Sequence, residues 1–329
     1  MARNSVYLYV MKLRLMSVQP ATKRYAWEIE VFLDQALKLG YNGNYIDVIG
    51  AYDTAPDQDW LKLQQKYPYV RFFFYKSTLG DCNYAPAIQS HSLAKHFKSH
   101  EYLKDEAIFY HDSDFVFTRF FDFEPFLHDS NWYFSNCDDY LGADYLEGKG
   151  NHKTDTQKDG SPINILDMMA KVVGICACKI RANRGRAGGA QKLMKNVDYK
   201  YWEEVEEDSI NLYNWLLQNK DDFGTEDRND IQVWTASMWA ELWNAYKRGR
   251  NVMVPSEFDF TWATCHVLKW DKHAFFHNAG VTSNQHGMFY KAEYHDKYPY
   301  SEDLQLDPNR ASSKYWELIK ETGKTSVLI

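Results

Sequence analysis

Cysteine and long apolar runs are scarce in this chain of 329 residues. Five cysteines are an odd and low number, which favours a reducing compartment over a disulfide framework. No apolar run approaches the roughly 18 residues that a membrane span needs. The first apolar stretch, Val6–Met11, is followed at once by Lys12 and Arg14 and is too short for a signal peptide. We therefore expect a cytoplasmic protein without a membrane span.

An excess of positive charge is also missing. Lys and Arg number 38 against 45 Asp and Glu, so the net charge is −7. This balance disfavours a nucleic-acid coat protein, which needs a cationic surface for phosphates. Apolar residues at 45% and charged residues at 25% are ordinary for a globular protein. Aromatic residues reach 16%. Because rings stack on sugars and bases, this favours a carbohydrate or nucleotide site, although a Tyr-rich core and surface would give the same number.

Strand and helix patterns alternate in the first part of the chain. The predicted strands are Val6–Met11, Tyr45–Gly50, Val70–Tyr75 and Ala107–Tyr110, and the predicted helices are Arg24–Leu39, Pro56–Tyr67 and Pro86–His100. This order predicts an α/β fold with a Rossmann-like, mostly parallel central sheet and helices on both faces. In such sheets, ligands bind beyond the carboxyl ends of the strands.

The second part of the chain is less regular. It predicts strands at Asn131–Asn136, Gly174–Ile180, Val252–Val254 and Ala274–His277, and helices at Pro162–Val173, Gly189–Lys195, Tyr199–Gln218, Asn229–Arg248 and Tyr315–Glu321. The polar stretch Gly148–Pro162 predicts a flexible loop, with a lid over an active site as one role. No composition change marks a boundary, so we expect one catalytic domain over residues 1–329 with an elaborated C-terminal half.

The sharpest chemical signal is the segment AIFYHDSDFVF, which begins at Ala107. Asp112 and Asp114 stand just past an apolar strand, where alternate side chains point the same way. Two such carboxylates can hold a hard divalent cation and leave other coordination positions for phosphate and water. Without a cation, the pairing of two anions would be unfavourable. A surface acidic loop is the alternative.

Here the sequence resembles the glycosyltransferases of the GT-A fold, in which a D-x-D motif ends the fourth strand of a nucleotide-binding half. The resemblance implies that Asp112, Ser113 and Asp114 bind a nucleotide-diphosphate sugar through Mn²⁺ or Mg²⁺. It implies a nucleotide-binding half at residues 1–118 and an acceptor-binding half at 119–329 with a C-terminal helical extension.

A second element, FFHNAGVT from Phe275, resembles the H-x-x-G of glycogenin-like members. His277 and Gly280 match it, which implies His277 as the third metal ligand. The family places a lysine three residues after the glycine, where this chain has Ser283. Lys291 is a candidate for the same phosphate contact from a longer loop. A hydrogen-bonded core histidine is the alternative for His277.

Two further elements match the family more loosely. The turn Gly188, Gly189, Ala190 and Gln191 is similar to a Gly-Gly-Ala turn beside the transferred sugar, and two glycines before a predicted helix would let backbone amides approach a ligand. The segment GTEDRNDIQ resembles an acidic x-E-D motif. It implies Glu226, Asp227 or Asp230 as the carboxylate that faces the acceptor, where a helix cap is the alternative.

The sequence therefore predicts a metal-dependent hexosyl- or pentosyltransferase that moves a sugar to an acceptor hydroxyl. The acceptor is a glycan or, less favoured by the net charge, a modified base of phage or viral DNA. A nucleotidyltransferase or another sugar-nucleotide enzyme would also place metal carboxylates at strand ends, but these usually have a Gly-rich basic loop after the first strand, and Lys12–Lys23 has no glycine. A non-catalytic carbohydrate-binding protein is the third class. Trp234, Trp239 and Trp243 lie at helical spacing and are expected in the core.

Overall fold

The computed structural model of the protein describes residues 11–224 and 231–329. A seven-stranded sheet forms its centre, in the order β10-β6-β9-β4-β1-β2-β3. Of these strands, β9 alone runs antiparallel to its neighbours β4 and β6, while the other pairings are parallel. The strands are β1 (Leu13–Pro20), β2 (Ile46–Tyr52), β3 (Arg71–Lys76), β4 (Ala107–Tyr110), β6 (Trp132–Asn136), β9 (Gly188–Lys195) and β10 (Val252–Met253). The predicted α/β fold with a mostly parallel sheet is confirmed.

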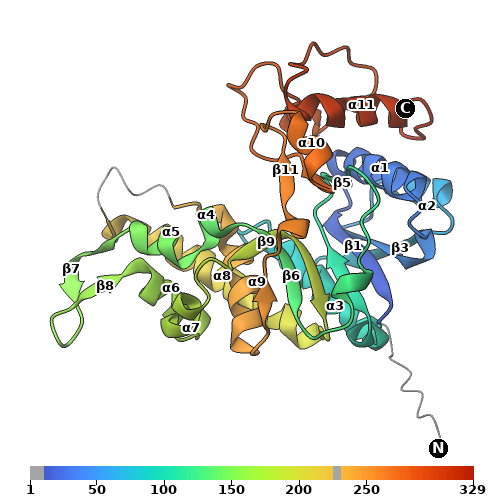
Figure 1. Ribbon diagram of the computed structural model, residues 1–329. Coiled ribbons are helices and arrows are strands. Elements are labelled where there is room, and N and C mark those ends of the chain that lie inside the picture. The colour runs from blue at the N-terminus through green and yellow to red at the C-terminus, as the bar shows by residue number, and fades with distance from the viewer. Residues whose placement is uncertain (1–10, 225–230) are drawn as a thin grey trace, which may run out of the picture.

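Helices cover the sheet in two groups (Figure 1). One group is α1 (Lys23–Lys38), which packs against α2 (Gln58–Lys66) and the C-terminal α11 (Ala311–Gly323). The other is α3 (Ala87–Ser99), α8 (Tyr199–Asn219) and α9 (Ala236–Lys247), which pack in that order. Strand β1 has β2 on one side and β4 on the other. After β1 the chain adds β2 and β3 on one side, and β4 is added on the other side. The direction in which strands are added therefore reverses between β1 and β4, and open α/β sheets bind ligands at such a position.

Smaller elements lie around this frame. A second sheet joins β5 (Phe115–Phe117), β12 (Phe275–His277) and β11 (Phe260–Trp262), with β12 in the middle. The remaining helices are α4 (Asp138–Leu141), α5 (Ala143–Gly148), α6 (Ile165–Val173), α7 (Ala177–Ala182) and α10 (Leu268–Lys272). No helix in the two described ranges is both long and apolar enough to cross a membrane.

The first strand differs from the prediction. It is Leu13–Pro20, whereas residues 6–10 of the expected Val6–Met11 strand lie outside the described residues. Arg14 made this segment look like a loop, yet its side chain is buried in the strand. Its Nε donates to Glu106 at 2.6 Å and its Nη1 to Asp47 at 3.0 Å. These two carboxylates compensate the buried guanidinium, which a sequence pattern does not reveal.

Two other element predictions are wrong. Gly189–Lys195 was expected to be helical but belongs to β9, every residue of which is buried. The predicted strand Gly174–Ile180 instead leads into α7, where Cys176 Sγ accepts a hydrogen bond from the Cys178 amide and the two cysteines form a disulfide. Its side chains are mostly exposed, and it has no neighbouring strand in the described sheets.

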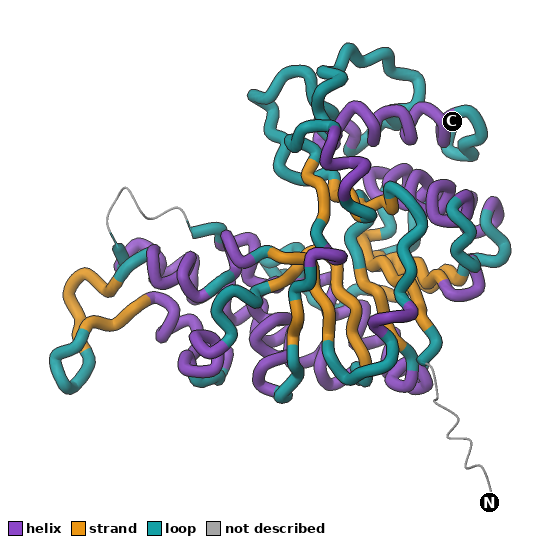
Figure 2. Tube along the Cα trace, viewed as in Figure 1, coloured by secondary structure: helices purple, strands orange, loops and turns teal. Residues whose placement is uncertain are grey.

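The predicted loop at Gly148–Pro162 contains structure. It forms most of a hairpin of β7 (Asn151–Thr156) and β8 (Pro162–Asn164). Figure 2 shows this hairpin at the end of the molecule opposite α11.

Candidate functional site: an Asp-Asp-His triad and two adjoining chambers

Three predicted metal ligands come together beyond the carboxyl end of β4. Asp112 and Asp114 follow that strand, and His277 ends β12, which pairs with β5 so that His277 lies opposite Phe115. One ligand atom from each residue lies within 4.8 Å of the others. His277 Nε2 is 3.1 Å from Asp114 Oδ1 and 3.6 Å from Asp112 Oδ2. The small sheet therefore brings a residue from near the far end of the chain to the D-x-D motif.

Positive side chains compensate the charge of Asp114. Burial by itself would raise the pKa of Asp114, but Lys291 and His277 outweigh it and hold that pKa well below its usual range. Burial lowers the pKa of His277 and of Lys291, and the acidic neighbours outweigh it in both, so each pKa is raised. Lys291 Nζ donates to Asp114 Oδ2. Basic side chains therefore lie beside the two carboxylates that follow the buried strand β4.

Gln191 orients the histidine. Its side-chain nitrogen lies 3.2 Å from His277 Nδ1, and its side-chain oxygen accepts a hydrogen bond of 2.8 Å from Ser135. Gln191 is fully buried. Rotation of the amide group would present its oxygen to a protonated Nδ1 and leave Nε2 free as a ligand, the usual role of a group behind a ligating histidine. The side chain of Gln191 lies behind His277, and its predicted contact with the donor stays a prediction.

A bulge in β9 produces this orientation. Phe134 lies opposite Lys192 and its neighbour Ser135 lies opposite Gly189, so Ala190 and Gln191 are extra residues on β9. Ala190 has φ of 51°, the left-handed region that side chains rarely adopt. Bulges of this kind turn side chains in a new direction beside functional sites. Here the bulge turns Gln191 towards His277 and places Ala190 on the cleft wall.

The two glycines before the bulge serve packing. A Cβ on Gly188 would come within 2.4 Å of Phe134 Cβ, and one on Gly189 within 2.4 Å of Met238 Cε. They precede no helix, and both are buried. The prediction that they precede a helix is therefore wrong, because both belong to β9, and their contact with the donor stays a prediction.

Helix α1 contributes a carboxylate that sequence reasoning missed. Glu28 is buried, and its Oε2 accepts a hydrogen bond from Ser113 Oγ. Burial raises the pKa of Glu28 to about 7; Asp114 adds to this effect and Lys291 opposes it. Glu28 lies mid-helix among apolar neighbours, and its only sequence signal is an acid on the buried face of α1.

The triad opens into a cavity that we call the triad chamber. It has a volume of about 390 Å³, and its walls include Glu28, Asp112, Asp114, His277 and Lys291. Gly280, with φ of +82°, forms a turn on its rim. The plane of Trp262 lies within 10° of that of the His277 ring, with ring centroids 6.0 Å apart.

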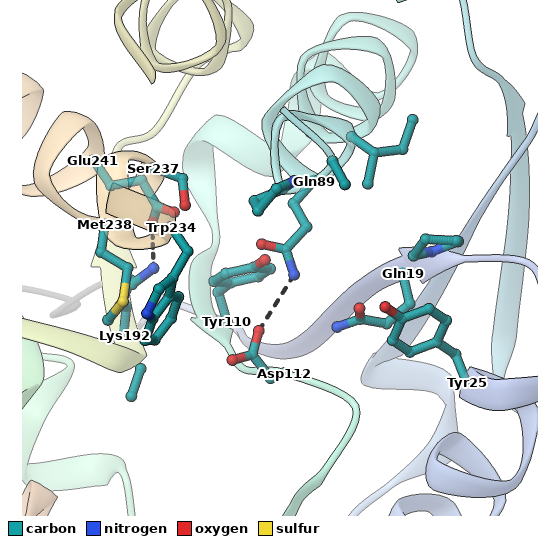
Figure 3. A pocket seen from close by; sticks show the side chains of 15 residues that line it. Gln19, Tyr25, Gln89, Tyr110, Asp112, Lys192, Trp234, Ser237, Met238 and Glu241 are labelled. Atoms are coloured by element: carbon teal, nitrogen blue, oxygen red, sulfur yellow. Dashed lines mark hydrogen bonds and ion pairs between the residues drawn. The ribbon is translucent and has the colours of Figure 1, made fainter. Parts of the chain in front are cut away.

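A second cavity adjoins the first, and we call it the Tyr110 chamber. It has a volume of about 250 Å³, and its walls include Gln89, Tyr110, Lys192 and Glu241. Asp112, Ala190 and Trp234 line both cavities. Figure 3 shows Trp234 and Met238 on one side of the hollow and Gln19 and Tyr25 on the other, with Asp112 between them. Gln89 donates to Asp112 at 3.3 Å.

The tryptophans on α9 and the turn before it divide into two kinds. Trp239 and Trp243 are fully buried, as predicted for core residues, but Trp234 is 60% exposed. Trp234 lies in the short turn Val233–Thr235. Its position on the wall of both chambers makes it a surface on which a sugar ring can stack, so its assignment to the core is wrong.

Some predicted residues are not placed at the site. Glu226, Asp227 and Asp230, the candidates for the acceptor-facing carboxylate, lie outside the described residues. Among the described residues that line the two chambers, none comes from Gly148–Pro162.

Comparisons with known proteins give distant likenesses. No protein-family model matches the chain, and no curated protein matches it. Solved structures similar to it include the bifunctional glycosyltransferase WbbM, at 11% identity over 83% of this chain and 46% of that chain, with a TM-score of 0.41. The glycosyltransferase GlyE of Streptococcus pneumoniae TIGR4 is 10% identical over 96% of this chain and 63% of that one, with a TM-score of 0.42. Mouse xyloside xylosyltransferase 1 is 8% identical over 81% of this chain and 97% of that one, with a TM-score of 0.41.

The chain thus spans about half to two thirds of the length of the first two structures. At TM-scores below 0.5 these likenesses add nothing to what the chain's own sheet and side chains show. The D-x-D motif follows β4, the fourth strand of a β-α-β series, and His277 joins it from a distant strand. The chain therefore has an α/β fold with a mostly parallel central sheet and an Asp-Asp-His triad beyond the carboxyl end of β4.

Proposed function

We propose that this protein is a metal-dependent glycosyltransferase that takes a sugar from a nucleotide-diphosphate sugar. The observation that carries the proposal is the triad of Asp112, Asp114 and His277, which lies where the order of strand addition reverses, between β1 and β4. Carboxylate oxygens with one imidazole suit Mn²⁺ and Mg²⁺. The ligand set is buried on one side and open to a chamber on the other, which leaves room for phosphate oxygens.

The residues present fit such an ion. Asp112 and Asp114 offer oxygens, His277 offers Nε2, and Gln191 holds the ring in place. When bound, a divalent ion would neutralise negative charge on a departing nucleoside diphosphate. Lys291 places an ammonium group beside the triad, where it would contact a phosphate oxygen.

The space for the rest of the donor lies along the same edge of the sheet. A third cavity of about 450 Å³ opens at the ends of β1, β2 and β3, with Thr22, Asp53 and Ser77 among its lining residues. Pro20 and Ile88 line both this cavity and the Tyr110 chamber. We keep a nucleotide-binding half at residues 1–118 and an acceptor-binding half at 119–329 as part of the proposal.

We assign the residues that act on the acceptor to the segment that precedes α9. We keep Glu226, Asp227 and Asp230 as the candidates that orient or deprotonate the acceptor hydroxyl. Ile231 is the first described residue after them, and Trp234 follows on the chamber wall. The exposed ring can stack on a glycan or on a base, and the net charge of −7 favours a glycan over DNA as the acceptor.

Thermal unfolding with a panel of nucleotides tests the proposal. The panel holds UDP, GDP, UDP-glucose, UDP-galactose, UDP-glucuronate and GDP-mannose, each with Mn²⁺ or with EDTA. Because a ligand that binds the native state raises the melting temperature, one nucleoside class should stabilise the protein with Mn²⁺ and not with EDTA. If no nucleotide stabilises it under either condition, the proposal is wrong. In turnover assays, release of nucleoside diphosphate supports glycosyl transfer, whereas release of pyrophosphate indicates a nucleotidyltransferase.

A further inference from the structure

The floor of the Tyr110 chamber holds a buried ion pair that the triad does not use. Lys192 on β9 and Glu241 on α9 are only 3% and 4% exposed, and Lys192 Nζ donates to Glu241 Oε2. Both residues line the cavity, and Figure 3 shows the pair beside Trp234. Their charges cancel, so the pair adds hydrogen-bonding groups to the chamber without adding net charge, and Asp112 is the other charged residue of the described lining.

A buried hydroxyl lies in the same chamber without a partner. Tyr110 is 2% exposed, and its phenol oxygen has no hydrogen-bond partner within the described parts of the chain. Lys192 Nζ lies 5.0 Å from the centre of its ring. Buried polar groups are nearly always hydrogen-bonded, so an unpaired one on a cavity wall points to a ligand.

The chemistry of the walls specifies that ligand. Sugar hydroxyls both donate and accept, and the chamber offers a phenol, an amide at Gln89, and the ends of an ion pair. Trp234 and Met238 supply apolar surface for a ring face. A sugar carboxylate would find no uncompensated cation among the described residues of this chamber and would lie near Asp112.

We infer that the Tyr110 chamber holds the transferred sugar and selects an uncharged one, with the Tyr110 hydroxyl and the Lys192–Glu241 pair as its specificity-determining groups. The inference rests on the proposed function, because a donor bound at the triad would place its sugar next to Asp112. It excludes uronic and other acidic sugars as the preferred donor group.

The test compares Tyr110→Phe with Tyr315→Phe. Tyr315, on α11, also buries a hydroxyl without a partner in the described structure, but it lines none of the cavities described above. Neither change should lower the stability of the protein without ligand, since each removes an unsatisfied polar group. Tyr110→Phe should weaken binding of the preferred neutral nucleotide sugar by about 3- to 10-fold, the worth of one hydrogen bond. It should leave binding of the matching diphosphate, UDP or GDP, unchanged. Tyr315→Phe should change neither.

The measurement is isothermal titration calorimetry with Mn²⁺ and the same panel. In the wild-type protein, UDP-glucuronate should bind at least about 10-fold more weakly than the best neutral UDP-hexose, or GDP-mannose should be the preferred ligand. Equal affinity for UDP-glucuronate and the best neutral UDP-hexose would overturn the inference. So would an unchanged affinity in Tyr110→Phe, or an equal loss for the diphosphate. If no nucleotide binds at all, the proposed function itself fails, which is a distinct result.

Discussion

The two chambers share Asp112 but differ in how their charges are balanced. The lining of the triad chamber holds three acids, Glu28, Asp112 and Asp114, and three basic residues, Arg24, His277 and Lys291. In the Tyr110 chamber, Lys192 and Glu241 already satisfy each other. Three ligand atoms within reach of one ion suit a divalent cation and its phosphates, whereas a mutually satisfied ion pair beside an unpaired hydroxyl suits a neutral polyol. The difference assigns the two ends of one substrate to two neighbouring cavities.

Removal of Asp112, the carboxylate that lines both chambers, should have the largest effect. Asp112→Asn keeps the shape of the side chain and its contact with Gln89 but removes a metal ligand. We expect turnover with the best donor to fall about 1,000-fold, which equals roughly 4 kcal/mol of transition-state stabilisation. Steady-state assays at saturating Mn²⁺ measure this. Asp105→Asn, an exposed change outside the site, should keep full activity. Unchanged turnover in Asp112→Asn would remove the metal role.

Asp112 is a better target than Asp114. The Asp114 side chain is 4% exposed and holds Lys291, whereas the Asp112 side chain is 34% exposed. Removing Asp114 would leave the partly buried ammonium group of Lys291 without its hydrogen-bond acceptor, which would lower stability as well as remove a metal ligand. Loss of activity in such a variant would then mix folding with chemistry.

The crowding of acids around Glu28 predicts a pH effect on stability. Because the pKa of Glu28 in the folded protein is raised to about 7 from an ordinary value of 4.5, the folded state holds this proton more tightly than the unfolded state. Its contribution is fully present below pH 4.5 and is lost as the pH rises through 7, by about 3 kcal/mol. Glu28→Gln should remove that loss.

Urea unfolding with EDTA, from pH 5 to pH 8.5, checks this prediction. The free energy of unfolding of Glu28→Gln should gain on the wild type as the pH rises. Glu257→Gln, which removes an exposed carboxylate, is the matched control and should follow the wild type. Parallel curves for wild type and Glu28→Gln would show that Glu28 is already ionised in the folded protein at pH 5.

Gln191→Met tests whether Gln191 supports His277 as a metal ligand in the triad chamber. The change keeps side-chain length but removes the groups that contact His277 and Ser135. Loss of a group behind a metal ligand typically lowers metal affinity by about 10- to 100-fold. Mn²⁺ titration followed by calorimetry measures the effect, and circular dichroism shows whether the fold is retained. Unaltered Mn²⁺ affinity in a folded variant would show that Gln191 has a packing role alone.

The smallest expected effects distinguish the two glycines of β9. Gly188→Ala should lower the free energy of unfolding by about 1–3 kcal/mol, because Phe134 Cβ and the Ser135 carbonyl lie next to the backbone and cannot move away. Gly189→Ala should cost less, since Met238 Cε is the end of a flexible side chain. Thermal unfolding of both variants checks the order. The reverse order would show that the Met238 contact is the rigid one.

Local sequence patterns were sufficient to predict a strand or helix where its apolar residues form a clear pattern. Ala107–Tyr110 was predicted with its observed bounds, and Asp112 and Asp114 followed from it. Patterns failed where distant charges decide the structure. Strand β1 buries Arg14 against Asp47 and Glu106, and β9 buries Lys192 against Glu241 and Lys195 against Asp129. A sequence read locally assigns such residues to exposed segments, since the compensating partners are 33 or more residues away.

The same limit explains the site residues that were missed. His277 was identified because its segment resembles the H-x-x-G element. No local sequence pattern marks Glu28, Tyr110 or Glu241 as cleft residues. Their roles depend on which face of an element meets the cavity, which only the packing of α1, β4 and α9 determines. Trp234 differs from Trp239 and Trp243 for the same reason, because it precedes α9 and does not share its buried face.

Electron paramagnetic resonance of Mn²⁺ tests the central claim most directly, because free Mn²⁺ gives a signal that binding suppresses. With excess diphosphate of the preferred nucleoside, titration should show one bound Mn²⁺ per wild-type chain. Asp112→Asn and His277→Ala should each bind it far more weakly, while Asp105→Asn should match the wild type. A wild-type chain that leaves all Mn²⁺ free, or variants that bind it as tightly as the wild type, would contradict the account.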